Sequence, residues 1–514
     1  MKIVLSEKDF DYEIQALINS FFPGQKSQVI VGEKGEWDKE ELLFFIHFGN
    51  TRIQVSMSVN GVSKEKEALV SGEGDWHKHT DKTAHPYRTY YKNELKRAIF
   101  ELIKEFPTKA LPEGVKKSIP VWGTMTGVRP TKIPMNQLLQ GKTDEEVGEE
   151  LRKCYCCTEE KWELCMGIAK REAELLKQVD FYGGYSLYIG IPFCPTTCLY
   201  CSFTSYPFQT FSHLVPSYLK ALKKEIAAVS KACAHRKLTS IYIGGGTPTT
   251  LNAEQLEELL SFVRTCFPME DSYEFTVEAG RPDSITRDKL EVLRKYHVER
   301  ISVNPQTMQQ KTLDLIGRKH TVEETKEAFL MARELGFSNI NMDLIIGLPG
   351  ETVEDFEDTL QQVEALHPDS ITVHSLVIKR ASALRTVLEE SEGVVFDEEH
   401  RGQQMEKMLS LSQEFAKAHG YKPYYMYRQK NSAGHYGSSG QENIGFSKPG
   451  KECLYNILIM EEMQTIAAVG AGASTKIYHP DKKIVSRIEN VKSITDYIDR
   501  IDEMIERKKG AFEQ

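Results

Sequence analysis

The chain has 514 residues, of which 40% are hydrophobic, and its formal net charge is −9 from 65 Lys and Arg against 74 Asp and Glu. This length predicts two to four domains of about 150 residues each, and the composition excludes a disordered or fibrous protein. An acidic balance without a long run of Lys or Arg also excludes the electrostatic signature of a protein that binds nucleic acid or an anionic membrane.

The N-terminal segment turns acidic before an apolar signal region develops, which argues against a secretory signal. No apolar run reaches the roughly 18 residues of a membrane helix. We therefore expect a cytoplasmic protein without membrane insertion. Thiols stay reduced there, so the ten cysteines are expected to be metal ligands or core residues and not disulfides.

Residues 1–110 are predicted to form a small α+β domain. Its expected strands are Lys2–Leu5, Gln28–Gly32, Leu42–His47 and Thr51–Val59, followed by a helix at Tyr87–Phe106. Pro and Gly punctuate residues 107–120, which is typical of a linker. A mostly helical stretch at about 131–178 makes 111–180 a predicted helical connector.

Residues 181–380 alternate apolar strands with amphipathic helices. The expected strands are Ser186–Phe193, Ser240–Ile243, Glu274–Glu278, Arg300–Val303, Ile340–Ile346 and Ser370–Leu376. Helices are expected between them at 213–233, 253–267, 284–296, 322–336 and 352–366. This alternation indicates a parallel sheet with right-handed crossovers. Six units are fewer than the eight of a closed barrel, so we predict an open, partial (β/α)6 TIM-like barrel whose site lies at the carboxyl ends of the strands.

The last segment, residues 381–514, is predicted to be a C-terminal α+β domain that extends the barrel. It has a helix near 397–419, a loop rich in Gly, Ser and Asn at 430–441, and a final helix near 492–508. The predicted fold class is therefore α/β, with an N-terminal α+β domain before the partial barrel and this extension after it.

The most specific motif is Cys194-Pro-Thr-Thr-Cys198-Leu-Tyr-Cys201, at the end of the first barrel strand. Three thiols within eight residues of a loop can converge on one metal centre. Structural zinc sites usually have four protein ligands, whereas a [4Fe–4S] cluster held by three cysteines keeps one iron open. Zinc with a distant fourth ligand, and three cysteines that simply pack in the core, are the alternatives.

With Tyr200 before the third cysteine and the barrel that follows, the motif resembles the radical S-adenosylmethionine superfamily. The string Leu187-Tyr188-Ile-Gly-Ile-Pro-Phe-Cys194 is similar to the oxygen-independent coproporphyrinogen III oxidases. Gly127-Val-Arg-Pro-Thr-Lys and Lys448-Pro-Gly-Lys-Glu-Cys453 resemble the HemZ-like branch of that family. The resemblance implies a [4Fe–4S] cluster on Cys194, Cys198 and Cys201, with S-adenosylmethionine as the second cofactor.

Further candidates for cofactor binding occur at successive strand ends. A glycine run in Ile243-Gly-Gly-Gly-Thr-Pro248 allows close approach of the backbone to a ligand, although such a run is more often a tight turn. By resemblance, Gly245, Gly246 and Thr247 bind the amino group of S-adenosylmethionine. By the same family pattern, the residues that contact this cofactor are Tyr188, Glu278, Gln306, Arg318 and Asp343, with Tyr200 beside a second molecule and Val377 and Gly470–Ser474 facing the adenosine.

Two residues, Asp343 and Arg281, also stand out by their local sequence. Asp343 stands inside the apolar run MDLIIGLP, where an unpaired carboxylate would be costly. Arg281 departs from the oxidase pattern, and a guanidinium near the site's mouth suits a substrate carboxylate, or else forms a surface ion pair. Tyr188, Arg281 and Arg318 are the catalytic candidates.

The remaining histidine and cysteines of interest are interpreted as structural. His374 lies in the last barrel strand and is expected to be a hydrogen-bonded core residue. The cysteines before the barrel lie on a helical pattern, which favours core packing over a second cluster; they are Cys154, Cys156, Cys157 and Cys165.

The resemblance implies cleavage of S-adenosylmethionine, after one-electron reduction by the cluster, to a 5′-deoxyadenosyl radical. In the oxidases this radical removes hydrogen from a propionate of coproporphyrinogen III. Loss of CO₂ and an electron then leaves a vinyl group, and two rounds give protoporphyrinogen IX in haem biosynthesis. The implied partners are a porphyrinogen or haem-like tetrapyrrole and an electron donor of the flavodoxin or ferredoxin type.

Two departures keep a haem chaperone of the same superfamily as the alternative. The oxidase pattern has a further cysteine where this chain has Phe203, and the chaperones lack it too. The chaperones, however, have a His-Asn pair where this chain has Tyr455-Asn456. A third hypothesis, an iron–sulfur electron-transfer module with four protein ligands, conflicts with the glycine run and the strand-end carboxylates.

Overall fold

A computed structural model describes residues 1–33, 41–70, 86–201, 205–267, 274–377, 384, 398–429, 442–482 and 484–513. The chain forms two compact units. The first comprises Met1–Lys170, Asp397–Glu406 and Tyr427–Glu442, and the second comprises Arg171–Phe396, Lys407–Met426 and Asn443–Gln514. The four-part division drawn from the sequence stays a prediction. The expected loop at 430–441 lies outside the described residues.

The first unit is built on a five-stranded sheet in the order β2-β1-β3-β4-β5. Its strands are β1 (Lys2–Leu5), β2 (Gln28–Val31), β3 (Leu43–Phe48), β4 (Arg52–Val59) and β5 (Val62–Leu69), and its first helices are α1 (Asp11–Phe21) and α2 (Pro86–Glu105). The four predicted strands and α2 are confirmed. The apolar face of the sheet forms one core with these helices, in which the rings of Phe21 and Phe100 meet at 5.2 Å.

Two elements of the first unit were not predicted, namely α1 and the edge strand β5. The signal for β5 is the dipeptide Asn60-Gly61, whose residues have φ of 51° and 72°. Two successive positive φ angles make the type I′ turn that joins antiparallel strands. The strand itself contains four consecutive charged residues, Lys64 to Glu67, and lies at the sheet edge, so it lacks the apolar run that identifies the other strands.

The predicted helical connector contains α3 (Lys132–Leu139), α4 (Asp144–Lys153) and α5 (Glu159–Leu176). A reciprocal capping box between Thr143 and Glu146 starts α4. The four cysteines of this region lie in or next to α4 and α5, where Cys157 and Cys165 are buried and Cys154 and Cys156 are half-buried.

The second unit contains an eleven-stranded sheet in the order β14-β15-β13-β12-β11-β10-β9-β6-β16-β17-β18. Its six central parallel strands are β6 (Gly184–Ile191), β9 (Lys237–Gly245), β10 (Glu274–Gly280), β11 (Arg300–Val303), β12 (Ile340–Ile346) and β13 (Ser370–Ser375). These are the six predicted barrel strands. Among the described residues, the two end strands of this sheet, β14 and β18, do not pair with each other, so the partial, open barrel is confirmed.

The C-terminal segment extends this sheet at both edges. β16 (Thr465–Val469) lies parallel to β6, and β15 (Glu442–Ser447) lies antiparallel to β13. The other strands of the unit are β14 (Lys422–Arg428), β17 (Ser474–His479) and β18 (Ile484–Glu489), with the separate pair β7 (Phe193–Cys194) and β8 (Tyr206–Pro207). The sequence predicted an α+β extension here without placing these strands.

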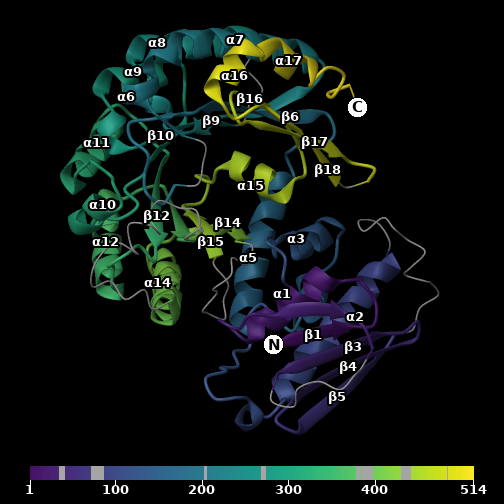
Figure 1. The fold of residues 1–514 in the computed structure, drawn as a ribbon. Coiled ribbons are helices and arrows are strands. Elements are labelled where there is room, and N and C mark those ends of the chain that lie inside the picture. The colour runs from purple at the N-terminus through teal and green to yellow at the C-terminus, as the bar shows by residue number, and fades with distance from the viewer. Residues whose placement is uncertain are drawn as a thin grey trace. The chain divides into compact units, whose positions relative to one another are not determined.

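The longer helices follow the outer side of the curved sheet in chain order (Figure 1). They are α7 (Val215–Ala232), α8 (Ala253–Cys266), α9 (Arg287–Lys295), α11 (Val322–Glu334) and α12 (Val353–Leu366). The short helices α6 (Phe208–Phe211) and α10 (Gln310–Leu315) precede α7 and α11 in the chain. Capping boxes that begin at Asn252, Thr321 and Thr352 fix the start of α8, α11 and α12. The predicted helix at 284–296 begins only at Arg287, because a 3₁₀ turn, η5 (Pro282–Ser284), comes first.

The described part of the C-terminal segment also contains the helices α14 (Glu398–Ala418), α15 (Leu454–Glu461), α16 (Ile494–Asp499) and α17 (Ile501–Glu506). The predicted helix at 397–419 is confirmed. The single helix expected at 492–508 is wrong, because Arg500, at φ −111° and ψ 24°, interrupts it. Among the helices that the structure describes, none is long and apolar enough to cross a membrane.

Candidate active site

The cysteine motif lies in the loop that follows β6, at the carboxyl edge of the parallel strands. Cys194 ends β7, and the amide of Cys201 donates to the carbonyl of Cys198 at 3.0 Å, which closes a turn. The amide of Leu199 donates to the carbonyl of Ile316 at 3.2 Å. The loop is therefore tied to the neighbouring loop after α10, which carries Arg318.

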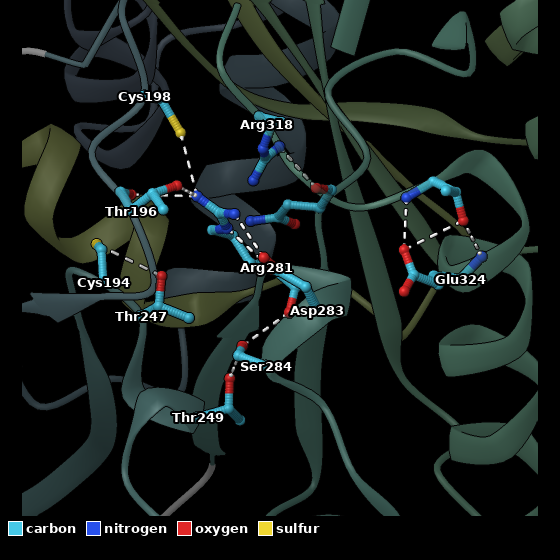
Figure 2. A network of polar contacts seen from close by, with 12 residues as sticks. Cys194, Thr196, Cys198, Thr247, Thr249, Arg281, Asp283, Ser284, Arg318 and Glu324 are labelled. Carbon is cyan, nitrogen blue, oxygen red and sulfur yellow. Dashed lines mark hydrogen bonds and ion pairs between the residues drawn. The ribbon is translucent and has the colours of Figure 1, made fainter. Parts of the chain in front are cut away.

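The sulfurs of Cys194 and Cys198 each accept a hydrogen bond from a side chain. The Thr247 hydroxyl donates to Cys194 Sγ at 3.5 Å, and Arg281 Nη1 donates to Cys198 Sγ at 3.8 Å (Figure 2). Burial raises the pKa of the Cys194 thiol to about 11. Within the described part of the chain, no three His, Cys, Asp or Glu side chains are placed closely enough to hold a metal ion. The three thiols thus share one loop without forming a closed ligand set.

The glycine run at the end of β9 packs against the cysteine loop. The amides of Gly246 and Thr247 donate to the carbonyls of Ile191 and Phe193, both at 2.7 Å. A Cβ on Gly246 would stand 2.6 Å from the Phe193 carbonyl oxygen and 3.0 Å from Cys194 Sγ. Glycine is therefore required here so that the backbone can approach the cysteine loop, which is more than a tight turn needs.

Arg281 lies at the end of β10 and its side chain is only 3% exposed. Its Nε donates to Asp283 Oδ1 at 2.9 Å and its Nη2 pairs with the other oxygen of that carboxylate. Its Nη1 donates to the carbonyl and hydroxyl oxygens of Thr196, at 3.1 and 2.6 Å. The guanidinium is buried, and every nitrogen has a partner inside the protein. The ion pair of the alternative interpretation is therefore present, but Arg281 is buried and not at the surface; the role toward a substrate carboxylate stays a prediction.

Glu278, near the end of β10, accepts a hydrogen bond from the hydroxyl of Tyr242 on β9. Burial raises the pKa of this carboxyl to about 7, against the lowering effect of the Tyr242 hydrogen bond and with a smaller raising effect from Asp343. A Cβ on Gly244 would stand 2.8 Å from the Glu278 carboxyl carbon. The carboxyl group is thus held against the glycine run by a partner that the sequence did not identify.

Three tyrosine rings lie nearly parallel beside Glu278. Tyr242 stacks on Tyr455 with centroids 4.4 Å apart, and Tyr188 lies 6.3 Å from Tyr242 and 6.2 Å from Tyr455. Burial raises the pKa of all three hydroxyls. Tyr188 comes from the predicted set, whereas Tyr455, at the start of α15, comes from the C-terminal extension.

The opposite side of the site is formed by the ends of β11 and β12. Gln306 adopts φ of 70°, and its backbone bridges β12 through the Asp343 carbonyl and the Ile345 amide, both at 2.9 Å. A positive φ on a residue other than glycine is costly and concentrates at functional sites. Gln306 Oε1 is buried without a hydrogen-bond partner among the described residues. The Asp343 carboxylate accepts a hydrogen bond from Asn341 Nδ2 at 2.7 Å.

Arg318 is as buried as Arg281, at 4% exposure, but it is bonded differently. Its Nη1 donates to the carbonyls of Asn304 and Pro305 at 2.9 and 3.3 Å, and its buried Nε has no partner in the described structure. Next to it, His320 is fully buried, and neither of its ring nitrogens has a hydrogen-bond partner among the described residues. Burial, then the charge of Arg318, lowers the pKa of His320 to about 3, so its ring is neutral at pH 7.

The other predicted residues make fewer described contacts with the cysteine loop and the glycine run. Tyr200 packs against an apolar cluster that includes Ile345 and Leu376, and Val377 follows β13 half-buried. His374 Nε2 lies 4.0 Å from Asp343 Oδ1, so it borders the site. The glycine-rich segment before β17 is fixed by a buried carboxylate, since the Gly470 amide donates to Glu225 at 2.9 Å. Phe203 lies outside the described residues.

Sequence reasoning missed Thr196, Tyr242, Asp283 and His320. Thr196 stands inside the cysteine motif and His320 inside IleGlyArgLysHis, so proximity to recognised motifs was an available signal for both. Tyr242 and Asp283 are polar residues on or just after barrel strands, and only their contacts distinguish them.

The three thiols of the cysteine motif are chemically suited to hold an iron–sulfur cluster. Thiolates are the ligands of such clusters, and hydrogen bonds to the ligating sulfurs are typical of their surroundings. Arg318 Nε and Gln306 Oε1 are a buried donor and a buried acceptor that no described residue satisfies, so both are free to bond a small polar cofactor. Closing the ligand set requires the cysteine side chains to turn toward one another.

Comparison with known proteins agrees with this geometry. The sequence matches the Radical SAM superfamily over residues 188–363. It is 43% identical over 399 residues to the oxygen-independent coproporphyrinogen-III oxidase-like protein HemZ of Bacillus subtilis, which covers 76% of this chain and 77% of HemZ. The heme chaperone HemW of the same organism is 33% identical over 319 residues, or 62% of this chain and 76% of HemW. Among solved structures, the chain is similar to coproporphyrinogen III oxidase HemN of Escherichia coli, which is a radical SAM enzyme. The TM-score is 0.50 and the sequence identity is 25%, and the match covers 65% of this chain and 73% of HemN.

Proposed function

Because the chain belongs to the radical SAM superfamily, in the family of HemZ-type coproporphyrinogen III oxidase-like proteins, we propose that it oxidatively decarboxylates coproporphyrinogen III to protoporphyrinogen IX. The cofactors of this proposal are a [4Fe–4S] cluster and S-adenosylmethionine, and the reductant is a flavodoxin- or ferredoxin-type protein of the cytoplasm. When bound, the cluster supplies the electron that cleaves the sulfonium of S-adenosylmethionine.

The protein's own residues would bind and orient these groups. Cys194, Cys198 and Cys201 would hold the cluster on the loop after β6. The backbone of the glycine run, which reaches Cys194 Sγ, would face the amino acid end of S-adenosylmethionine. Glu278, as a carboxylate, would accept hydrogen bonds from the ligand.

The observation that carries the proposal is two buried polar atoms on residues that follow β11. Arg318 Nε and Gln306 Oε1 have no partner among the described residues, and an unsatisfied buried donor or acceptor costs about 1–3 kcal/mol. The positive φ angle of Gln306 adds a further cost in backbone strain. A polar ligand that contacts both residues offsets this cost, and S-adenosylmethionine carries the carboxylate and hydroxyl groups that suit a guanidinium and an amide.

The alternative, a haem chaperone, is supported by the likeness to HemW. In the chaperone pattern a histidine follows the Pro-Gly-His-Glu-Cys segment, and Tyr455 holds that position here. Tyr455 is 3% exposed and stacks on Tyr242, and burial raises its pKa, so it does not present a ready ligand to haem iron. This favours the oxidase.

The test is anaerobic reconstitution with iron and sulfide, followed by dithionite, S-adenosylmethionine and coproporphyrinogen III. We expect 5′-deoxyadenosine and a vinyl product in fixed proportion. 5′-Deoxyadenosine without a vinyl product would keep the radical SAM chemistry and reject the substrate. Tight haem binding without 5′-deoxyadenosine would favour the chaperone. Cys198→Ala is the negative control, and it must form neither product.

A further inference from the structure

We propose that Arg281 is a positioning residue for the cysteine loop: it fixes the backbone between Cys194 and Cys198 and donates a hydrogen bond to the Cys198 sulfur. The inference rests on the proposed function in one respect, that these thiols are cluster ligands. Arg281 itself would not touch the substrate, which replaces the carboxylate-binding role expected from the sequence.

One nitrogen of Arg281 contacts three atoms of the loop. Nη1 lies 3.1 Å from the Thr196 carbonyl oxygen, 2.6 Å from the Thr196 hydroxyl and 3.8 Å from Cys198 Sγ. Thr196 stands midway between Cys194 and Cys198. The two oxygen contacts therefore set the course of the backbone that spaces these two sulfurs.

Arg281 is itself held rigidly by the segment around η5. Asp283 takes the other two guanidinium nitrogens in a two-point ion pair, which has a defined orientation. The Ser284 hydroxyl donates to the Arg281 carbonyl at 2.7 Å and lies 2.7 Å from the Thr249 hydroxyl (Figure 2). Because both ends of the side chain are fixed and buried, it meets the cysteine loop with little rotamer freedom left to lose.

This arrangement has two measurable consequences. Without the guanidinium, the loop loses its bonds at Thr196, so Cys198 becomes more accessible even in the protein without a cluster. A cationic donor near a ligating sulfur also stabilises added negative charge, and hydrogen bonds to the sulfurs help to set the potential of a cluster. Arg281 should therefore make the cluster easier to reduce.

The first experiment labels the cysteines of the metal-free protein with iodoacetamide over a range of pH and measures each peptide by mass spectrometry. The limiting rates of the ionised thiols are compared, because a nearby cation also changes the thiolate fraction. We expect Arg281→Gln to raise the labelling rate of Cys198 several-fold, with Arg281→Lys between it and the wild type. Arg287→Gln is the matched control, because Arg287 is an exposed arginine nearby that pairs with Glu334. Buried Cys165 reports global unfolding, and a rate at Cys198 equal to that of the control would overturn the proposal.

The second experiment titrates the reconstituted cluster by electron paramagnetic resonance without S-adenosylmethionine. We expect Arg281→Gln to lower the ratio of reduced to oxidised cluster about tenfold at a fixed potential, or 59 mV for one electron. An unchanged ratio would overturn the contact with sulfur. A wild-type protein that takes up no cluster would reject the proposed function, and the labelling result then decides the positioning role by itself.

Discussion

The two buried arginines at the strand ends divide the site into two halves. On the side of β9 and β10, Arg281 uses all three nitrogens on Asp283 and the cysteine loop. On the side of β11 and β12, Arg318 uses Nη1 on two carbonyls and keeps a buried Nε without a described partner. The side chains are almost equally buried, so burial alone does not distinguish their roles.

The difference shows which half is built for the protein and which for a ligand. Buried polar groups are normally paired. In the first half, Thr247, Tyr242 and Arg281 all have partners inside the protein. In the second half, Gln306, Arg318 and His320 each keep a buried atom that has no partner in the described part of the chain. We therefore interpret the first half as the support of the cysteine loop and the second as the surface that binds the small-molecule cofactor.

The largest expected effect is that of Cys198→Ala in the first half. Losing one of three thiol ligands should abolish cluster assembly, and with it all formation of 5′-deoxyadenosine. Iron and acid-labile sulfide per chain, with the absorbance of the reconstituted protein, measure this. Cys266→Ala, at the half-buried end of α8, is the matched control and should assemble the cluster normally. A full cluster in Cys198→Ala would contradict the assignment of the loop.

Arg318→Gln should give the next largest effect, confined to the second half. A hydrogen bond to a charged group contributes about 1.5–3 kcal/mol, so affinity for S-adenosylmethionine should fall roughly 10- to 100-fold while the iron content stays that of the wild type. Equilibrium dialysis of the reconstituted protein measures the affinity, with Arg287→Gln as the control. An equal loss of iron would place Arg318 in the support of the loop and would remove the distinction between the halves.

The fold could be predicted further than the site. The six barrel strands were recognisable because they are continuous apolar runs separated by capped helices, as with Thr321 and Glu324 before α11. The cysteines were identified by their spacing alone. The orientation of Arg281 was not predictable, because it depends on Asp283 and on Thr196, a residue 85 positions away in the chain. The Tyr455 stack likewise brings the C-terminal extension onto β6 and β9, a long-range contact that leaves no local pattern.

A smaller and pH-dependent effect is expected at Glu278, where the halves meet. Its pKa is raised to about 7, first by burial, and the neighbouring groups are Tyr242, Asp343 and Arg300. Protonation below this pKa removes the acceptor charge, so affinity for S-adenosylmethionine should fall up to tenfold per pH unit as the pH drops below about 7.

The stability of the cofactor-free protein should change in the opposite sense. The folded carboxyl holds its proton up to a higher pH than the ordinary value of 4.5, so its contribution to stability is full below 4.5 and is lost as the pH rises through 7. Glu278→Gln should remove both dependences. Tyr242→Phe, which deletes the hydrogen bond that lowers this pKa, should move the affinity transition to higher pH, and an unmoved transition would contradict the assignment.

The smallest effects should differ in sign between the halves. Thr247→Val deletes a satisfied hydroxyl and should lower the free energy of unfolding by about 0.5–1.5 kcal/mol, the usual contribution of one hydrogen bond. His320→Phe replaces a buried ring whose two nitrogens have no described partner, so it should leave stability unchanged or raise it by about 1 kcal/mol. Urea unfolding of the cofactor-free protein at pH 7 measures both, with Thr265→Val on the exposed face of α8 as the control.

Because the His320 pKa is lowered to about 3, the wild-type ring also costs stability as the pH falls below 6.5, and the advantage of His320→Phe should grow there. Losses of equal size at both positions would mean that His320 is paired in solution, and that the second half supports the fold as the first half does.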